Sequence, residues 1–250
     1  MNLSIEEAVA RSVGAGRSPP TLRLWTCTPS VIIGLSESVD EEVNLDYCKE
    51  IGATVARRFT GGGTVFVDQG NLNFAVSVKD DNQSPFPKDI LKSYETLANG
   101  ILGATKIFGI DARYHRDEIQ VSGLKISGFA GANEFGVIFR HGTLLISTNP
   151  SSIYSSLRRI KRQVSNLERL AQQGISMGST LDSVRRGFEK SFNIDTFRAS
   201  YLEPEEERIK AILLREKYSK NNWNFEGKLP ENLTLESLIL TKESDLPVSV

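Results

Sequence analysis

Hydrophobic positions recur along this chain with two different spacings. In residues 5–14 and 88–104 they return every three or four positions, as in amphipathic helices, whereas in 64–68 and 72–78 they alternate with polar positions, as in strands. This pattern predicts helices at 5–14, 40–51, 88–104, 150–157, 166–172, 178–191 and 203–217. It predicts strands at 22–27, 30–35, 53–59, 64–68, 72–78, 106–113, 117–122, 124–132, 135–140 and 142–147.

Capping residues and the order of the elements indicate the fold class. Ser4, followed three residues later by Glu7, has the pattern of a capping box for the first helix, and Asp40 is placed to cap the second. The order of helix, strands, helix, strands and helices predicts an α+β fold, in which a mixed, largely antiparallel sheet carries helices on one face. We expect residues 1–227 to form one domain and residues 228–250 to be a short tail, with at most one strand near 233–241.

Composition excludes several classes of function. With 30 Lys+Arg against 31 Asp+Glu, the chain lacks the basic excess of a general nucleic-acid binder. No apolar run approaches the roughly 18–20 residues of a membrane span, and the N-terminal residues do not form a signal peptide. We therefore expect a cytoplasmic protein with neither nucleic acid nor membrane as a partner. Two cysteines, Cys27 and Cys48, are too few for a disulfide framework or a four-thiolate zinc site.

The most informative segment is ARRFTGGGTVFVDQGNLNF, residues 56–74, in which three glycines separate two strand patterns. Glycines let backbone N–H groups approach a ligand closely, and such a run can form a concave site for phosphate or carboxylate. Of Arg57 and Arg58, which precede it, strand alternation points only one toward the site. Asp68 and Asn71 are candidates to hold a divalent cation through oxygen atoms. The alternative is a flexible hairpin flanked by solvated charges.

A second informative segment is GLKISGFAGANEFGVIFRHGTLLIS, residues 123–147. Lys125 lies in a strand pattern between Gly123 and Gly128, where a compact ammonium group suits the neutralisation of a phosphate. The alternative is a solvent-facing lysine on the polar face of the strand. His141 opens the next strand pattern, and a single histidine in such a place is more often structural than catalytic.

These segments together resemble the lipoate–protein ligase family. RRFTGGGTVFVDQGNLNF matches that family's triple-glycine segment, GLKISGFA its lysine segment and RHGTLLIS its His-Gly-Thr-Leu-Leu segment. Supporting matches are LRLWTCTPSVIIGLSES, VSNLERL and KYSKNNWNFEG, in the family's order and spacing. The resemblance covers roughly residues 20–227 and implies the fold shared by biotin and lipoate ligases and related to class II aminoacyl-tRNA synthetases, a mixed sheet flanked by helices.

The resemblance implies a two-step reaction that uses Mg-ATP. The carboxylate of lipoate, or of octanoate, attacks the α-phosphate to give acyl-AMP and pyrophosphate. A lysine of a lipoyl domain, such as that of a 2-oxoacid dehydrogenase E2 subunit, or of the glycine cleavage H-protein, then takes the acyl group and releases AMP. Such chemistry depends on positioning and charge neutralisation more than on a side-chain nucleophile.

Roles for individual residues follow from the same resemblance. Lys125 is implied as the catalytic residue, in contact with the carboxylate and the α-phosphate. Arg58 is the first choice for a ligand-facing charge and Arg57 the second, while Asp68 is the expected Mg²⁺ ligand. The remaining residues implied in binding of substrate or nucleotide are Gly61, Gly62, Gly63, Thr64, Asn71, Asp117, Gly128, His141 and Gly142.

The chain also departs from the family pattern. Val67 stands where the family often has a histidine, and Arg116 stands where it has the asparagine of an Asn-Asp pair, so that only Asp117 carries over. Longer relatives carry a C-terminal accessory domain, whereas about 24 residues remain here (227–250). We therefore expect a separate small accessory protein as a partner of this chain.

Two other functions remain open at this point. An octanoyltransferase of the same superfamily would carry the acyl group on a cysteine near the lysine segment, but Cys27 and Cys48 lie far upstream of it. A non-catalytic module that kept only the fold would have no need for Lys125 and the three glycines. Biotin ligase is disfavoured because its Gly-Arg-Gly-Arg loop is absent.

Overall fold

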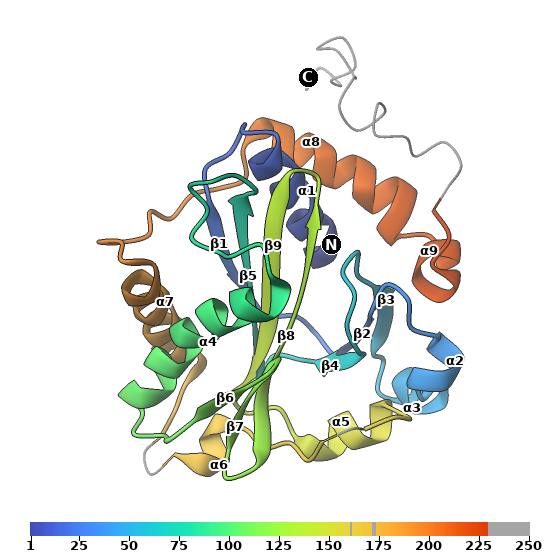
Figure 1. The fold of residues 1–250 in the computed structure, drawn as a ribbon. Helices are drawn as coiled ribbons and strands as arrows, with labels where there is room; N and C mark the ends of the chain where they lie inside the picture. The colour runs from blue at the N-terminus through green and yellow to red at the C-terminus, as the bar shows by residue number, and fades with distance from the viewer. Residues whose placement is uncertain (161, 172–173, 230–250) are drawn as a thin grey trace, which may run out of the picture.

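Two β-sheets organise the part of the chain that the computed structural model describes, which is residues 1–160, 162–171 and 174–229 (Figure 1). The larger sheet has the strand order β1-β5-β9-β8-β7-β6, and all its neighbouring strands are antiparallel. Its strands are β1 (Thr21–Trp25), β5 (Asn71–Lys79), β6 (Arg113–His115), β7 (Glu118–Val121), β8 (Leu124–Glu134) and β9 (Val137–Leu145). This sheet confirms the predicted mixed α+β class.

The smaller sheet has the strand order β3-β2-β4. Its strands are β2 (Ser30–Ile33), β3 (Thr54–Arg57) and β4 (Val65–Val67). β2 runs parallel to β3 and antiparallel to β4. The predicted strands 22–27 and 30–35 therefore belong to different sheets, and the turn between them at Thr28-Pro29 joins one sheet to the other.

Helices cover both faces of the larger sheet. They are α1 (Asn2–Gly14), α2 (Val39–Glu42), α3 (Leu45–Glu50), α4 (Ile90–Ile107), α5 (Pro150–Ser156), α6 (Leu167–Leu170), α7 (Met177–Phe192), α8 (Pro204–Leu213), the π-helical turn η1 (Leu214–Tyr218) and α9 (Asn221–Glu226). α4 and α7 pack together on one face, while α1 and α8 pack on the other (Figure 1). The expectation of helices on one face only is thus wrong.

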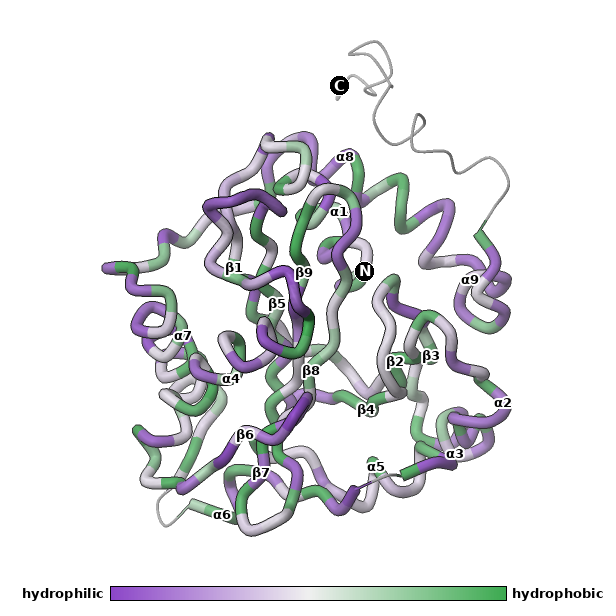
Figure 2. Tube along the Cα trace, in the orientation of Figure 1, coloured by the Kyte–Doolittle hydropathy of each residue, from purple (hydrophilic) through white to green (hydrophobic). Residues whose placement is uncertain are grey.

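Strand β5 shows why both faces are covered. Its residues are buried from Asn71 to Val78, so neither face of the strand meets solvent. Phe74 packs on the α7 side, with its ring 5.8 Å from that of Phe188, whereas Ala75 packs with Val9 of α1. Figure 2 shows α8 as alternating hydrophobic and hydrophilic stretches, as expected of a helix with one buried face. Apolar residues on both sides of a strand require a covering layer on each.

Several predicted boundaries differ from the structure. The predicted strand 106–113 is wrong except at its last residue, because α4 continues to Ile107 and β6 begins only at Arg113. The predicted strands 135–140 and 142–147 form one strand, β9, which stays paired with β5 and β8 through Gly142. The predicted helix 40–51 is divided into α2 and α3, because the Asn44 side chain caps a new helix by accepting a hydrogen bond from Tyr47 N.

Neither predicted cap is a cap in the structure. Helix α1 begins at Asn2, and the Ser4 hydroxyl donates a hydrogen bond to Met1 O from inside the helix. Glu7 instead faces the C-terminal helices, and Asp40 lies within α2. The strand expected near 233–241, with most of the predicted tail, lies outside the described residues. Among the helices that are described, none is long and apolar enough to cross a membrane.

Candidate active site

A cavity of about 410 Å³ lies between the two sheets. β2 and β4 of the smaller sheet supply Ile32, Val65 and Phe66, and β8 and β9 of the larger sheet supply the opposite wall. The predicted residues that line it are Arg58, Gly62, Gly63, Thr64, Asp117, Lys125, Gly128, His141 and Gly142. The fold thus brings three separate sequence segments to one place.

Lys125 enters the cavity from the start of β8. Its Nζ lies 3.4 Å from Oε2 of Glu118 on the neighbouring strand β7, and its side chain is 30% exposed. A Cβ added to Gly128 would lie 2.7 Å from Lys125 Nζ. The ammonium group therefore occupies the space that the side chain of any other residue at position 128 would need. The alternative of a lysine pointing into solvent is therefore wrong. Gly128 is needed for the position of this ammonium group.

The triple-glycine loop is held by Arg58. Arg58 Nη2 donates hydrogen bonds to the carbonyls of Gly61 (2.7 Å) and Gly63 (2.9 Å), and Nε donates to Thr60 Oγ1 (3.0 Å). Burial lowers the Arg58 pKa from its ordinary value to about 10, which still leaves the group protonated at neutral pH. The loop is thus clamped by a buried cation, in contrast to the alternative of a freely moving hairpin.

Gly62 has a backbone conformation that other residues adopt at a cost. Its φ is +88°, and an added Cβ would lie 3.0 Å from Arg58 Nη2. The Gly62 carbonyl oxygen in turn lies close to Gly34. A Cβ added to Gly34 would lie only 1.8 Å from this oxygen. At Gly61, by contrast, an added Cβ meets nothing within 4 Å. The middle glycine is the one that the loop geometry demands.

His141 is a neutral group in the cavity wall. Its Nε2 lies 2.7 Å from Thr60 Oγ1, and that hydroxyl already accepts a hydrogen bond from Arg58, so it has its proton to donate to Nε2. Burial, together with the positive charges of Arg58 and Arg140, holds the His141 pKa well below 6.5. The arrangement favours the tautomer protonated on Nδ1.

Arg57 lies outside the cavity and ties two parts of the fold together. Its Nη1 donates to the carbonyls of Gly34, Leu35 and Glu37, and its Nε donates to Trp223 O (3.0 Å). Its side chain is among the largest that are fully buried. As strand alternation predicts, one arginine of the pair faces the site, and it is Arg58.

Three other predicted residues also lie outside the cavity lining, namely Gly61, Asn71 and Asp68. The Asn71 side chain donates to Asn73 Oδ1 (3.1 Å), and it is Asn73 that reaches the cavity. Asp68 Oδ1 accepts hydrogen bonds from Gly70 N (2.9 Å) and Thr148 Oγ1 (2.6 Å), which close the turn before β5. Asp68 therefore has a local structural role in this fold.

The described residues do not form a metal site of their own. No group of three or more His, Cys, Asp or Glu side chains that could hold an ion occurs among them. Asp68, the predicted ligand, does not fit this role because it lies outside the cavity and is engaged in the turn. Asp117 is a carboxylate at the cavity, and it follows Arg116, whose left-handed φ of 61° is a conformation that asparagine adopts more readily.

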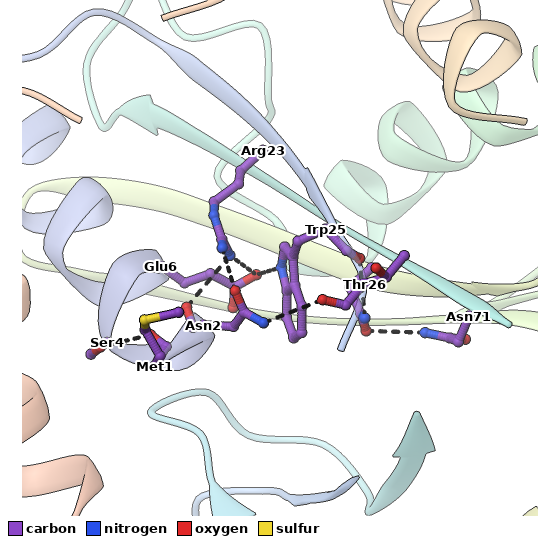
Figure 3. Close-up of polar contacts among 9 residues, drawn as sticks. Met1, Asn2, Ser4, Glu6, Arg23, Trp25, Thr26 and Asn71 are labelled. Carbon is purple, nitrogen blue, oxygen red and sulfur yellow. Dashed lines mark hydrogen bonds and ion pairs between the residues drawn. The ribbon is translucent and has the colours of Figure 1, made fainter. Parts of the chain in front are cut away.

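A second group of residues that line the cavity, at α1 and β1, was not predicted from the sequence. Glu6 of α1 accepts a hydrogen bond from Trp25 Nε1 (2.7 Å) and lies 4.0 Å from Arg23, as Figure 3 shows. Burial raises the Glu6 pKa above its ordinary value, although Arg23 opposes this. The sequence predicts the helix that contains Glu6. The partners of the Glu6 carboxylate, however, depend on where the fold places β1.

Two hydroxyl groups at the cavity lack partners. Thr64 Oγ1 and Ser127 Oγ are buried, line the cavity and have no hydrogen-bond partner. Buried polar groups are nearly always paired, so these two hydroxyls are available to pair with a ligand in the cavity. Thr64 follows the triple glycine and Ser127 lies two residues after Lys125, hence these hydroxyls belong to the same two motifs.

The cavity combines cations with apolar walls. Lys125 and Arg58 supply positive charge, and Leu3, Ile32, Val65 and Leu145 supply aliphatic surface. Such a site suits a ligand with an anionic end and an aliphatic chain, because the chain is removed from water while the anion is neutralised. The geometry by itself does not distinguish one such acid from another.

Comparison with known proteins identifies the family. The model of the lipoyl protein ligase A/B catalytic domain matches residues 1–189. Lipoate-protein ligase A subunit 1 of Thermoplasma acidophilum is 34% identical over 90% of this chain and 91% of its own length. Octanoyltransferase LipM of Brevibacillus brevis is 25% identical over 90% of this chain and 94% of its own.

Solved structures agree in fold over most of the chain. A T. acidophilum protein with bound lipoic acid has a TM-score of 0.81 at 32% identity, covering 90% of this chain and 93% of its own. Lipoate-protein ligase A bound with ATP gives 0.81 at 32% identity, over 89% of this chain and 92% of its own. The bi-partite T. acidophilum lipoate protein ligase, studied with its E2 lipoyl domain, gives 0.82 at 30% identity, with 93% of each chain covered. The chain therefore belongs to the lipoyl protein ligase A/B catalytic-domain family.

Proposed function

We propose that this protein is an ATP-dependent lipoate–protein ligase, which activates lipoate or octanoate as the acyl-adenylate and transfers it to a protein lysine. The observation that carries the proposal is the position of Lys125, whose ammonium group lies in the wall of a cavity with aliphatic sides and a clamped glycine loop. Relatives of this fold have been solved with lipoic acid and with ATP, which supports both substrates. We also propose that residues 1–227 form the catalytic domain.

The first step forms a phosphorus–oxygen bond between the acid and ATP. A carboxylate oxygen attacks the α-phosphorus, the bond to the β-phosphate oxygen breaks, and pyrophosphate leaves with that electron pair. Lys125 neutralises charge on the carboxylate and the α-phosphate as it grows in the transition state. Mg²⁺ would accompany ATP through the nucleotide's phosphates, and Asp117, one of the carboxylates that line the cavity, would assist in holding it.

The second step transfers the acyl group to an amine. The acceptor lysine nitrogen attacks the acyl carbon, the bond to AMP breaks, and the proton of the amine is lost to solvent or to the leaving phosphate. Lys125 then stabilises the departing AMP. His141, neutral because of its depressed pKa, adds no competing charge to the acyl pocket that it lines with Gly142.

An octanoyltransferase remains the second candidate, because the LipM relatives cover the chain as fully as the ligases do. A transferase of this kind needs a reactive thiol at the cavity. Neither Cys27 nor Cys48 lines the cavity, and burial raises the pKa of both thiols, which lowers their thiolate fraction. The placement of the two cysteines favours the ligase.

The proposal includes two protein partners. The acceptors are lipoyl domains of 2-oxoacid dehydrogenase E2 subunits and the glycine cleavage H-protein. A separate small accessory protein completes the ligase, and support comes from the relative described as bi-partite and studied with its E2 lipoyl domain. On this proposal the chain alone forms acyl-adenylate poorly.

The test is pyrophosphate release from ATP on addition of lipoate, with and without the candidate accessory protein. A ligase releases pyrophosphate, whereas an octanoyltransferase or a non-catalytic module does not. Lys125→Ala is expected to lower the rate by roughly 10²–10³-fold, the usual cost of a lost electrostatic contact to a transition state. Lys79→Ala, at the exposed end of β5, is the matched control. Normal turnover by Lys125→Ala would overturn the assignment, and full activity of the chain alone would overturn the need for a partner.

A further inference from the structure

A buried carboxylate lies at the point where the cavity is expected to receive anions. Glu118 on β7 has a side chain that is 5% exposed, and it lines the cavity beside Lys125. Its Oε2 lies 3.4 Å from Lys125 Nζ, and its Oε1 lies 3.3 Å from Arg162 Nε. Gln120 Nε2 donates a further hydrogen bond to Oε1. One carboxylate thus joins two cations that belong to different segments.

The backbone around these side chains is fixed. Glu118 pairs with Gly128 across the β7–β8 ladder. The Lys125 ammonium group lies over this same Gly128. Lys125 N donates to Gln163 O (2.9 Å), and Ser165 N donates to Lys125 O (3.0 Å), so the segment that follows Arg162 runs alongside β8. The three charged groups therefore come from elements that are hydrogen-bonded to one another.

A buried negative charge beside an anion-binding lysine is unfavourable unless it has a purpose or a partner. Without Glu118, no carboxylate would lie between the like charges of Lys125 and Arg162, and these charges would repel each other. With it, the group of three carries a net charge of +1 and the lysine has a defined position over Gly128. Catalysis by charge neutralisation depends on such preorganised geometry, because a displacement of about 1 Å can cost 10²-fold in rate.

We propose that Glu118 is a positioning residue, which holds the Lys125 ammonium group over Gly128 and joins Arg162 to it, so that both cations are presented together to the reacting anion. In this role Glu118 acts on the reaction through Lys125 and Arg162. This inference rests on the proposed function only in that Lys125 is taken as the catalytic group. It gives one of the carboxylates that line the cavity a part in positioning the cations.

Kinetics of Glu118→Gln test the proposal. The variant keeps the size and one acceptor oxygen but loses the charge, so Lys125 is no longer held in place. We expect kcat for lipoate-dependent pyrophosphate release to fall by roughly 10–100-fold with KM for lipoate changed by less than about threefold, because the lost contact matters in the transition state. Glu206→Gln is the matched control, since Glu206 is also buried but accepts its hydrogen bonds from Ser18 Oγ and Glu203 N, outside the cavity lining. An unchanged kcat in Glu118→Gln would overturn the proposal.

A second readout does not depend on activity. In the complete protein, Lys125 is labelled by an amine-reactive acylating reagent and quantified by mass spectrometry, with Lys79 as internal reference. The contact with Glu118 competes with the reagent for the Lys125 amine, so Glu118→Gln should label Lys125 faster by roughly fivefold, the factor that corresponds to the loss of one ion pair. Equal labelling in the variant and the wild type would overturn the inference. If Glu118→Gln does not fold, Glu118→Asp, which keeps the charge but shortens the reach, should label at an intermediate rate.

The two proposals fail in distinguishable ways. If the wild-type protein with its partner releases no pyrophosphate, the proposed function fails, and labelling of Lys125 still decides the role of Glu118. If pyrophosphate is released normally by both the wild type and Glu118→Gln, the proposed function stands and the positioning role is wrong.

Discussion

At the residue scale, the glycines of the cavity have different physical tasks. Gly62 supplies a positive φ, and its carbonyl lies where Gly34 has no Cβ, whereas Gly128 supplies room for the Lys125 ammonium group. Gly61 does neither, since an added Cβ there meets nothing within 4 Å. A run of three identical residues therefore contains one whose side chain is forbidden by conformation and contact and one that is not.

This difference predicts unequal effects of the same substitution. Gly62→Ala should reduce lipoate-dependent pyrophosphate release strongly and destabilise the fold by about 1–3 kcal/mol, because a residue with a Cβ is strained at positive φ and meets Arg58. Gly61→Ala should change the free energy of unfolding by less than about 0.5 kcal/mol. Urea unfolding of both variants measures this, and equal losses at the two positions would show that the loop geometry is not the cause.

At the element scale, the C-terminal helical segment completes the structure around the smaller sheet. Trp223 Nε1 of α9 donates to Arg57 O (2.8 Å), and Asn224 Oδ1 accepts from Arg57 N (3.2 Å). The turn η1 places Lys217 and Tyr218 against Glu7 of α1, at 2.7 and 2.6 Å. These contacts explain why a Lys-Tyr and Trp-Asn pattern far from the cavity accompanies the site motifs in the sequence.

The buried ion pair of Glu7 and Lys217 allows a prediction about how η1 and α1 stabilise the fold. Burial by itself would raise the Glu7 pKa, but the positive charges of Lys217 and Arg11 outweigh it, so the Glu7 pKa lies below its ordinary value. Lys217→Met should lower the free energy of unfolding by about 3–5 kcal/mol, because it leaves a buried carboxylate short of a partner. Lys210→Met, which removes the surface pair with Glu207, should cost less than about 1 kcal/mol. Similar costs for the two lysines, measured by urea unfolding, would contradict the buried role of Lys217.

At the scale of the whole molecule, the burial of His141 between the two sheets makes the free energy of unfolding depend on pH. The folded protein keeps His141 neutral because its pKa lies well below 6.5, whereas the unfolded chain takes up a proton near pH 6.5. The unfolded state therefore binds more protons as the pH falls below about 6.5, and the stability of the folded state decreases in that range. The loss stops only when the pH reaches the lower pKa of the folded state.

The corresponding prediction compares the wild type with His141→Gln, which keeps a hydrogen-bonding side chain but does not titrate. Between pH 7.5 and 5.5 the wild type should lose about 1.4 kcal/mol more of its free energy of unfolding than the variant does, since one proton is bound on unfolding. Urea unfolding at several pH values measures the difference. Parallel curves for the two proteins would mean that folded His141 is free to protonate.

Much of the site could be predicted from the sequence because its parts are local. The triple glycine with Arg58, the lysine segment with Gly128, and His141 with Gly142 are each contained in a few consecutive residues, and each of these segments contributes to the lining of one cavity. Asp68 and Asn71 belong to the same local pattern, yet they lie outside the lining, because Asp68 accepts hydrogen bonds in the turn before β5 and the Asn71 side chain donates to Asn73 within β5. The motifs therefore predicted which segments form the cavity more reliably than they predicted which individual residues line it.

The sequence by itself determined the α+β class, most of the elements, the family and the motifs that meet at the cavity, since these depend on local periodicity and on consecutive residues. Only the tertiary structure decided that β1 and β2 belong to different sheets, that helices cover both faces, and that Arg57 is structural while Arg58 faces the site. It alone brought Glu118 and Arg162 to Lys125, and Glu6 to the same cavity. The reason is that strand order and side-chain charge pairs between distant segments are set by packing, which minimises buried unpaired charge over the whole fold and leaves no local pattern in the chain.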